Sequence, residues 1–236
     1  MWLWLCVRDG VASAVRELGS TPLIGFGGAP FTLAAYMVEG RPSRDHLAAR
    51  ALAASDPGAW DALMSWCARV SADFITSQVE AGASVAQLFD SWVGSLSPRT
   101  YRESVAPYSR MVAQRVAGAV SPVTGERAPL IHFGTGSAPI LPDMAEVGAD
   151  CVGVDWKTDL SWAVAQVPGK AVQGNLDPAL LQAPWSVSEH AVRDILDAGR
   201  SAPGHVFNLG HGVPPTTAPD VLTRIVELVR ELGGSR

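Results

Sequence analysis

The sequence predicts an α/β fold of the (β/α)8 barrel type that is incomplete, with about six of the eight βα units present. Short apolar segments end in Gly, Asp, Asn or His and alternate with segments that carry helical signals. This alternation is the pattern of parallel βαβ units. We count six such units in 236 residues, whereas a closed barrel of this type needs eight. The chain is 47% hydrophobic, which is enough to bury one sizeable core.

Six segments have the length and composition of strands that are buried on both faces, and turn residues bound each of them. In parallel α/β folds the functional groups gather where such strands end, and these segments carry polar residues at their ends. The expected strands are Pro22–Gly28, Ser84–Asp90, Pro129–Thr135, Asp150–Trp156, Ala171–Asp177 and His205–His211.

Helices are placed between these strands by their terminal residues. An Asp or Ser followed by Pro is typical of a helix start, because the side chain accepts a backbone N–H and the proline needs no donor. Gly82 and Gly233 are expected to stop helices. The expected spans are a helix after Pro30, Pro57–Glu80, Pro98–Ala119, a helix from Pro178 and Asp220–Leu232, with a loop insertion at Gly118–Pro129.

Charge and cysteine content exclude several classes of partner. The formal net charge is −5, so no basic field invites nucleic acid. The three cysteines have no CxxC spacing and are odd in number, which indicates reduced thiols in a cytoplasmic protein.

The first seven residues, Met1–Val7, are apolar but are followed at once by Arg8 and Asp9. They are too few to span a bilayer, which takes about 20 residues, and no basic segment precedes them as in a signal peptide. We therefore expect no membrane association. Three interpretations stay open for this segment: a buried strand-like piece, a frayed start, or an artefact of a truncated gene.

Five blocks of sequence, in this order and spacing, resemble the uroporphyrinogen decarboxylase family. The resemblance runs from about Val15 to Glu231 and leaves residues 1–14 poorly matched. It implies that residues 1–236 form a single barrel domain of that family. The blocks are Pro22–Gly40, Ala81–Trp92, Gly148–Trp156, Gln173–Pro178 and Asn208–Gly212.

The resemblance implies a reaction without a cofactor. Four acetate side chains of the tetrapyrrole uroporphyrinogen III lose CO2 one after another and become methyl groups, which gives coproporphyrinogen III. A protonated pyrrole ring acts as the electron sink. Members of the family are typically homodimers, so the resemblance also implies a homodimer.

Three residues match substrate-binding positions of the family: Tyr36, Ser91 and His211. By themselves the residues have more ordinary explanations. Tyr36 could be a helix tyrosine packed in the core with a wet hydroxyl, Ser91 a helix cap or a loop hydroxyl, and His211 a structural histidine. The resemblance favours the substrate-binding role for Tyr36 and Ser91. Gly210 and Gly212 favour that role for His211, because they let the backbone approach a ligand.

Carboxylates also follow the expected strands, at Asp90, Asp155 and Asp177. Asp177 before a proline is best explained as a helix N-cap. Asp155 is followed by Trp156 and Lys157, and the lysine ammonium could pair with Asp155 or meet a substrate carboxylate. We assign none of these residues a catalytic role.

The catalytic groups of the family do not match any residue here. The resemblance places its arginines in an Arg-Gln-Ala-Gly-Arg motif and its aspartate after a further strand, and neither motif occurs in this sequence. No catalytic residue is therefore assigned. Arg41 and Arg44 follow the Glu39-Gly40 turn and could contact substrate carboxylates, but solvated loop arginines are the default interpretation. We expect this chain alone to be weakly active or inactive, and to self-associate.

A zinc site is not indicated. Relatives of the fold that transfer methyl groups from corrinoids hold zinc through His-x-Cys, but His132 is followed by Phe133 and Gly134. A corrinoid-linked methyltransferase is thus the less favoured alternative. A non-catalytic remnant that binds tetrapyrrole or only dimerises is the other.

Overall fold

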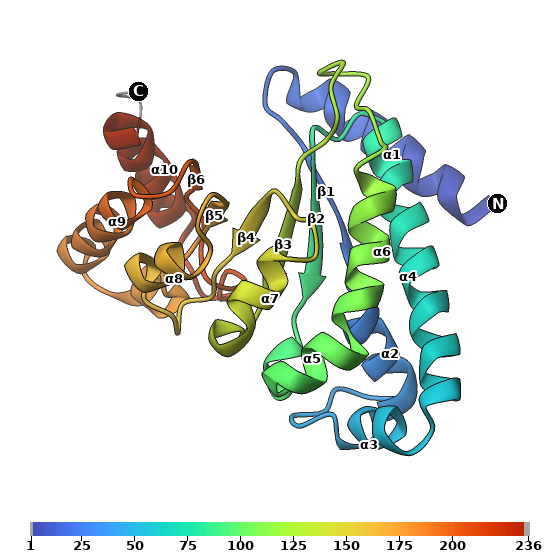
Figure 1. Cartoon of the computed structure of the whole chain (residues 1–236). Coiled ribbons are helices and arrows are strands. Elements are labelled where there is room, and N and C mark those ends of the chain that lie inside the picture. The colour runs from blue at the N-terminus through green and yellow to red at the C-terminus, as the bar shows by residue number, and fades with distance from the viewer. Residues whose placement is uncertain (1, 234–236) are drawn as a thin grey trace.

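A computed structural model describes residues 2–233, and its six strands form one parallel sheet in the order β1-β2-β3-β4-β5-β6 (Figure 1). This is the α/β barrel-type fold expected from the sequence, and each strand lies inside one of the six predicted segments. The strands are β1 Ile24–Gly28, β2 Val85–Asp90, β3 Leu130–Gly134, β4 Cys151–Gly153, β5 Ala171–Gln173 and β6 His205–Val206.

Ten α-helices and three short 3-10 helices surround the sheet in the described residues. They are α1 Trp2–Leu18, α2 Pro30–Glu39, α3 Leu47–Ser55, α4 Pro57–Glu80, η1 Val93–Ser95, α5 Pro98–Ser104, α6 Ala106–Val116, η2 Ala138–Ile140, α7 Leu141–Ala145, α8 Leu160–Gln166, η3 Pro178–Gln182, α9 Trp185–Gly199 and α10 Pro219–Gly233.

The sheet is curved, so that its inner face is concave. A hydrogen bond crosses this inner face. Gln87 Oε1 on β2 accepts it from Gln173 Nε2 on β5, at 3.2 Å. These two strands are separated by β3 and β4. Gly153 on β4 makes room for the Phe133 side chain of β3, since a Cβ there would lie 2.8 Å from Phe133 Cβ. The two glutamines are buried, and their contact holds the two halves of the sheet together from the inside.

Burial on both faces was predicted for every strand and is wrong for the two edge strands. Ile24 and Phe26 on β1 are 39% and 56% exposed, and Val206 on β6 is 44% exposed. Their side chains project from the concave face, and β1 and β6 do not pair with each other in residues 2–233. The middle strands β3 and β4 are buried as expected.

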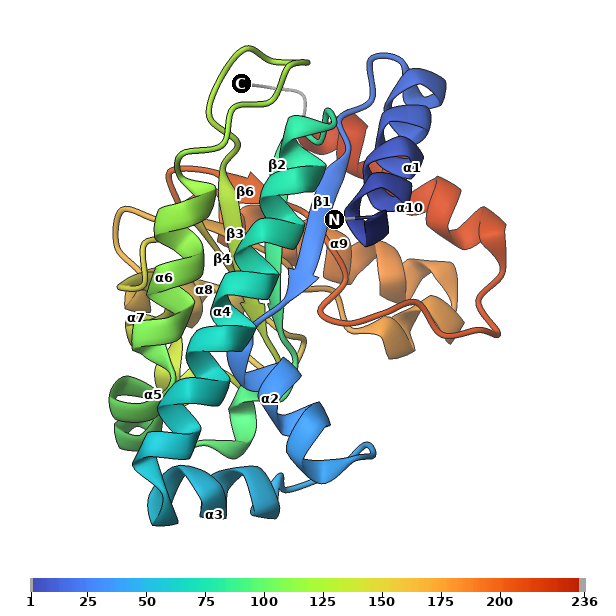
Figure 2. The ribbon, with the colours of Figure 1, turned by 90° about the vertical axis from the view of Figure 1, so that its right-hand side faces the viewer.

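The outer face of β2 and β3 packs against α4 and α6, which lie side by side in Figure 1 and Figure 2. Ile75 of α4, Leu88 of β2 and Val112 of α6 belong to one buried cluster. A second cluster joins α9 and α10, around Val192 and Leu228. The apolar face of each helix is thereby removed from water, which is the main driving force for its formation.

The strand-like interpretation of Met1–Val7 is wrong for the described part, since helix α1 begins at Trp2. Met1 itself lies outside the described residues. Half-buried side chains recur every three or four positions along α1, at Trp4, Val7, Val11 and Val15, which is the period of a helix. The ring of Trp4 lies 5.2 Å from that of Phe74 on α4, so this face packs on α4.

The single helix expected from Pro98 to Ala119 is two helices. Pro107 lacks a backbone N–H and its ring conflicts with the carbonyl group four residues earlier, so the chain breaks at Val105. The helix expected from Pro178 is a 3-10 turn, and α9 begins only after Pro184. Asp177 caps that turn as predicted, with its side chain accepting the Ala179 N–H at 2.9 Å.

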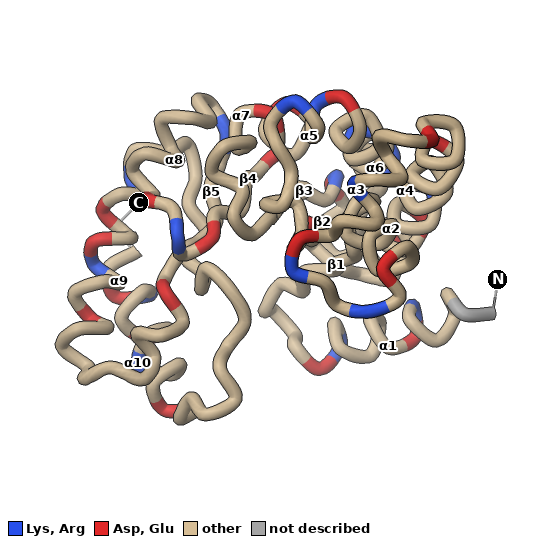
Figure 3. The backbone as a smooth tube through the Cα atoms, turned by 90° about the horizontal axis from the view of Figure 1, so that it is seen from below, with Lys and Arg blue, Asp and Glu red and all other residues tan. Residues whose placement is uncertain are grey.

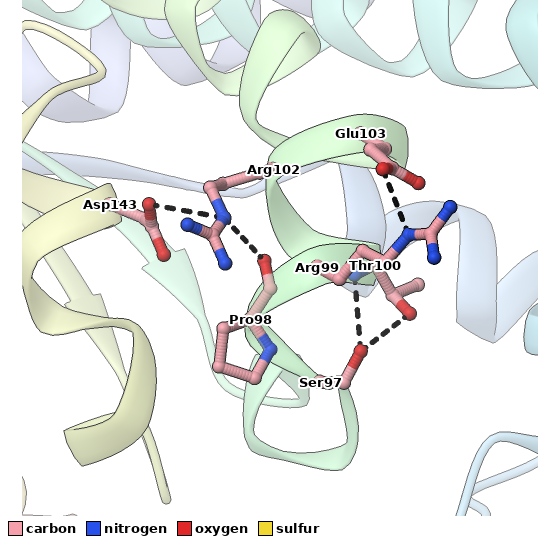
Figure 4. A network of polar contacts seen from close by, with 7 residues as sticks. All are labelled: Ser97, Pro98, Arg99, Thr100, Arg102, Glu103 and Asp143. Carbon is pink, nitrogen blue, oxygen red and sulfur yellow. Dashed lines mark hydrogen bonds and ion pairs between the residues drawn. The ribbon is translucent and has the colours of Figure 1, made fainter.

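Helix α5 shows how local contacts fix an element beneath the strand ends (Figure 4). The Ser97 hydroxyl accepts the Thr100 N–H at 3.1 Å, which satisfies one of the open donors of the first turn. Arg102 donates to the Pro98 carbonyl group at 3.2 Å and pairs with Asp143 of α7 at 3.6 Å. The second contact ties α5 to α7.

All three cysteines carry free thiols, and two of them are buried. Burial raises the pKa of the Cys67 thiol to about 11 and that of the Cys151 thiol to about 12. Neither thiol is therefore ionised near neutral pH, whereas Cys6 is exposed. Among residues 2–233, no helix combines the length and the apolar character that a bilayer crossing demands.

The exposed side chains of the concave face lead to a first prediction. Because Phe26 and Val206 leave apolar surface beside unpaired strand edges, we expect the purified chain to self-associate. Phe26→Lys combined with Val206→Lys should shift sedimentation velocity profiles toward monomer. Val123→Lys, at a 54% exposed position in the loop before β3, is the matched control and should change nothing. A wild-type chain that stays monomeric at high micromolar concentration would contradict this prediction.

Candidate functional site

The strands deliver their loops to one edge of the sheet, and a cavity of about 320 Å³ lies there. Figure 3 looks from below onto this edge, where the loop after α2 carries both basic and acidic positions. The lining comes from residues 43–46 of that loop, from the turn after β2, from residues 135–136 after β3 and from Lys157 after β4. Four separate connections therefore meet around one space.

Ser91 lies at this cavity, and Tyr36 stands beside it. The Tyr36 ring stacks on Trp92 with centroids 3.8 Å apart, and Trp92 lines the cavity. Tyr36 is 48% exposed, so it is not packed in the core. The structure thus brings two of the three predicted substrate-binding residues to the same wall.

His211 lies farther along the same edge. Its ring meets the Trp156 ring edge to face at 5.3 Å, and the Lys157 ammonium lies 5.0 Å from the centroid of Trp156. Since Lys157 lines the cavity, Trp156 and Lys157 connect His211 to it. His211 itself is exposed and does not line the cavity.

Gly210 has a different role from the one predicted. A Cβ at this position would lie 2.2 Å from the backbone nitrogen of Trp156. The glycine therefore lets the loop after β6 approach the loop after β4, rather than a ligand. Nothing lies within 4 Å of a Cβ built on Gly212.

Most hydroxyl groups around the cavity are used within the protein. Ser95 Oγ donates to the Trp92 carbonyl oxygen at 3.0 Å, and Thr135 Oγ1 donates to the Ser91 carbonyl oxygen. Ser43 Oγ accepts the His46 N–H at 3.2 Å. The Ser91 hydroxyl differs, since it bonds to no residue in the described range 2–233 and caps no helix there. It is therefore available to a ligand.

His46, which sequence reasoning missed, closes the cavity behind Trp92. It is 3% exposed, and its ring stacks on Trp92 at 4.5 Å. Burial lowers the pKa of His46, although the nearby Glu39 and Asp45 act in the opposite direction. The neutral imidazole is therefore the favoured form near neutral pH.

The hydrogen bonds of Ser95 fix the tautomer of that neutral ring. Ser95 Oγ has one proton, which goes to the Trp92 carbonyl oxygen. His46 Nδ1, 3.1 Å from the same Oγ, must then carry the ring proton and donate it. This leaves Nε2 as an acceptor, and Nε2 is buried with no partner among the described residues.

Asp155 is the hub of the loops around the site. Its carboxylate is fully buried and accepts the Gly136 N–H at 2.5 Å, the Lys157 N–H at 3.2 Å and the Thr158 hydroxyl at 3.0 Å. It therefore pairs with the backbone of Lys157 and not with its ammonium group. The Asn175 amide adds the loop after β5, donating to the carbonyl oxygens of Asp155 at 2.8 Å and Thr158 at 2.6 Å.

Asp90 faces away from the cavity, into the layer between sheet and helices. It is fully buried, and Thr32 Oγ1 of α2 donates to Oδ1 at 3.0 Å. His132 Nε2 lies 3.6 Å from Oδ2, and the two side chains have no further partner in the described residues. Within residues 2–233 no three His, Cys, Asp or Glu side chains are arranged to hold a metal ion.

Arg44 and Lys157 were considered in the sequence analysis but were not assigned to the site. Both are exposed, as expected of loop residues, yet both line the cavity beside Ser91. No sequence signal distinguishes such residues from solvated loop cations, because their convergence depends on loops that are far apart in the chain.

A family model described as Uroporphyrinogen decarboxylase (URO-D) matches residues 5–232. The matched range includes most of the segment 1–14, for which the sequence motifs had no counterpart. A protein named uroporphyrinogen decarboxylase from Arthrobacter sp. (strain FB24) is 55% identical over 227 residues. Another of that name, from Salinispora tropica, is 54% identical over 227 residues.

These relatives are longer than the chain. The alignments cover 96% of this chain but 64% of the Arthrobacter protein and 59% of the Salinispora protein. A solved methyltransferase from Methanosarcina mazei superposes with a TM-score of 0.80 at 19% identity, covering 96% of this chain and 64% of that one. At this identity the likeness shows a shared fold and nothing about the reaction.

The hub role of Asp155 is tested by removing its carboxylate. Asp155→Ala leaves the Gly136 and Lys157 N–H groups without their acceptor, so the free energy of unfolding should fall by about 3 kcal/mol. Asp194→Asn is the control, since its contact with His190 is a surface pair and should change stability by less than about 0.5 kcal/mol. Urea denaturation measures both variants, and equal stabilities would refute the hub role.

Proposed function

Because the chain belongs to the uroporphyrinogen decarboxylase family, we propose that it acts in the decarboxylation of uroporphyrinogen III to coproporphyrinogen III. Tyr36, Ser91 and His211 are the proposed substrate contacts. The observation that carries this assignment is the Ser91 hydroxyl, which stays unbonded in the described structure while the hydroxyl groups around it are bonded internally.

The proposed reaction requires donors around an anionic substrate. In each of four steps the bond between an acetate methylene and its carboxyl carbon breaks, CO2 leaves, and a proton takes its place to complete a methyl group. The substrate carries eight carboxylates, and charge-assisted hydrogen bonds are the strongest way to hold them. The phenol of Tyr36 and the hydroxyl of Ser91 are such donors, and they share one wall.

The remaining properties of the family are also proposed for this chain. We place it in the cytoplasm as a homodimer that binds neither nucleic acid nor membranes, with a tetrapyrrole as its small-molecule substrate and no cofactor. The net charge of −5 supports the proposal that the chain does not bind nucleic acid. The free cysteines support a cytoplasmic location. Sedimentation of the chain together with its substrate would test the dimer.

Turnover is the direct test of the proposed reaction. Anaerobic uroporphyrinogen III is incubated with the purified chain, and the oxidised porphyrins are separated by HPLC. The Arg-Gln-Ala-Gly-Arg motif is absent from the sequence, so we expect slow or no loss of carboxyl groups by the chain alone. Adding the part of the Arthrobacter relative that lies outside its alignment with this chain, as a separate polypeptide, should produce stepwise decarboxylation. Ordinary enzymatic rates without that addition would show that the motif is dispensable.

The substrate contacts are tested by binding, which does not depend on turnover. Ser91→Ala and Tyr36→Phe each remove one hydrogen-bond donor, so the Kd for uroporphyrin III should rise about five- to tenfold. Ser186→Ala, at an exposed position of α9, is the matched control and should leave the Kd unchanged. Fluorescence titration measures all four proteins, and identical affinities would remove Tyr36 and Ser91 from the site.

A further inference from the structure

Two cations converge on the cavity from different parts of the chain. Arg44 belongs to the loop between α2 and α3, and Lys157 to the loop after β4, and both line the same space as Ser91. Neither forms an ion pair with any residue in the described range. The only contact of the Lys157 ammonium there is with the face of Trp156.

Several arginines elsewhere in the described part of the chain pair with carboxylates, whereas these two cations at the cavity do not. Arg8, Arg99, Arg102, Arg115, Arg127 and Arg193 all lie within 4 Å of a carboxylate. Asp45 also lines the cavity and offsets part of the charge, which leaves the lining with a net charge of +1 from these three residues. The chain as a whole carries −5, so this cavity is positive within an acidic protein.

Two further groups at the cavity lack partners. The Ser91 hydroxyl bonds to no described residue, and His46 Nε2 is buried without a partner. A substrate carboxylate accepts the Ser91 O–H. The neutral His46 ring offers a carboxylate no proton, because its Nδ1–H is used by Ser95 and its Nε2 is a buried acceptor.

The size of the cavity limits what enters it. Pockets that enclose whole drug-sized ligands span about 300–1,000 Å³, and this one is near the lower end at about 320 Å³. A tetrapyrrole with eight carboxylate arms is larger than such a ligand. The cavity therefore accommodates one arm, while the macrocycle lies outside it, toward Tyr36 and His211.

We infer that Arg44 and Lys157, with Ser91, form a subsite for one side-chain carboxylate of the tetrapyrrole. Arg44 and Lys157 are then specificity residues, since they recognise a charge and not the ring. This inference rests on the proposed function and adds to it the residues that select a polycarboxylate.

The test is the affinity of the chain for uroporphyrin III, measured by fluorescence titration. Arg44→Gln and Lys157→Gln each remove one cation, and each should raise the Kd about tenfold at low salt. Arg41→Gln is the matched control, because Arg41 lies on the same loop but does not line the cavity, and its Kd should stay within about twofold of wild type. Arg44→Lys keeps the charge and should lose less affinity than Arg44→Gln.

The outcomes separate this inference from the proposed function. Tenfold losses in the two cavity variants support the subsite whether or not the chain turns over uroporphyrinogen. Unchanged affinities overturn the subsite and leave the decarboxylase assignment standing. An equal loss in Arg41→Gln also overturns it, because the effect is then one of overall charge. Absence of any binding by the wild-type chain overturns both.

Discussion

The buried carboxylate of Asp155 is the interaction that holds the candidate site in one geometry. A charged group with no access to water is costly unless it is fully hydrogen-bonded. Asp155 meets this requirement with N–H and O–H donors from two loops, at Gly136, Lys157 and Thr158. Those loops follow different strands, so satisfying one carboxylate fixes their relative positions.

The consequences of this hub reach the cavity directly. Gly136 and Lys157 both line it, and each donates its backbone N–H to Asp155. The Lys157 side chain is thereby free to point at solvent or ligand while its backbone is held. The Trp92 ring contacts both the Tyr36 ring and the His46 ring, and it thereby links α2 to the loop before α3. Close packing of loops completes the site, as at Gly94, where a Cβ would lie 2.3 Å from the Thr135 carbonyl oxygen.

The curvature of the sheet adds a second constraint. The contact of Gln173 with Gln87 joins β5 to β2 across the concave face. The same curvature exposes Phe26 and Val206 at the edges. The candidate site therefore lies at the edge where the strands end. The side chains expected to promote self-association lie on the concave face of the same sheet.

Local sequence signals predicted most of the fold. The six strands, the helix stop at Gly82 and the Asp177 cap follow from short patterns of apolar and turn residues. Ser91, in contrast, was selected by the family resemblance. The edges of the sheet were mispredicted, because an apolar pattern does not reveal whether a second strand or solvent covers it. Pro107 was overlooked as a helix break within an otherwise helical stretch.

The site was predictable only where its residues lie next to a strand end or match the family. The partners of Asp155 come from loops about 20 residues apart, and Lys157 contacts Asp155 through its backbone N–H and not through its ammonium group. Arg44 and His46 belong to a loop whose path depends on Trp92, far away in sequence. No single-residue signal distinguishes such a loop from a solvated one.

A crystal structure of the chain with uroporphyrin III bound tests the central claim most directly. The account predicts the macrocycle at the edge where the strands end, beside Tyr36 and His211, with one carboxylate between Arg44 and Lys157 and within hydrogen-bond distance of Ser91 Oγ. A macrocycle bound instead against Phe26 on the concave face, or at the opposite edge of the sheet, would contradict it.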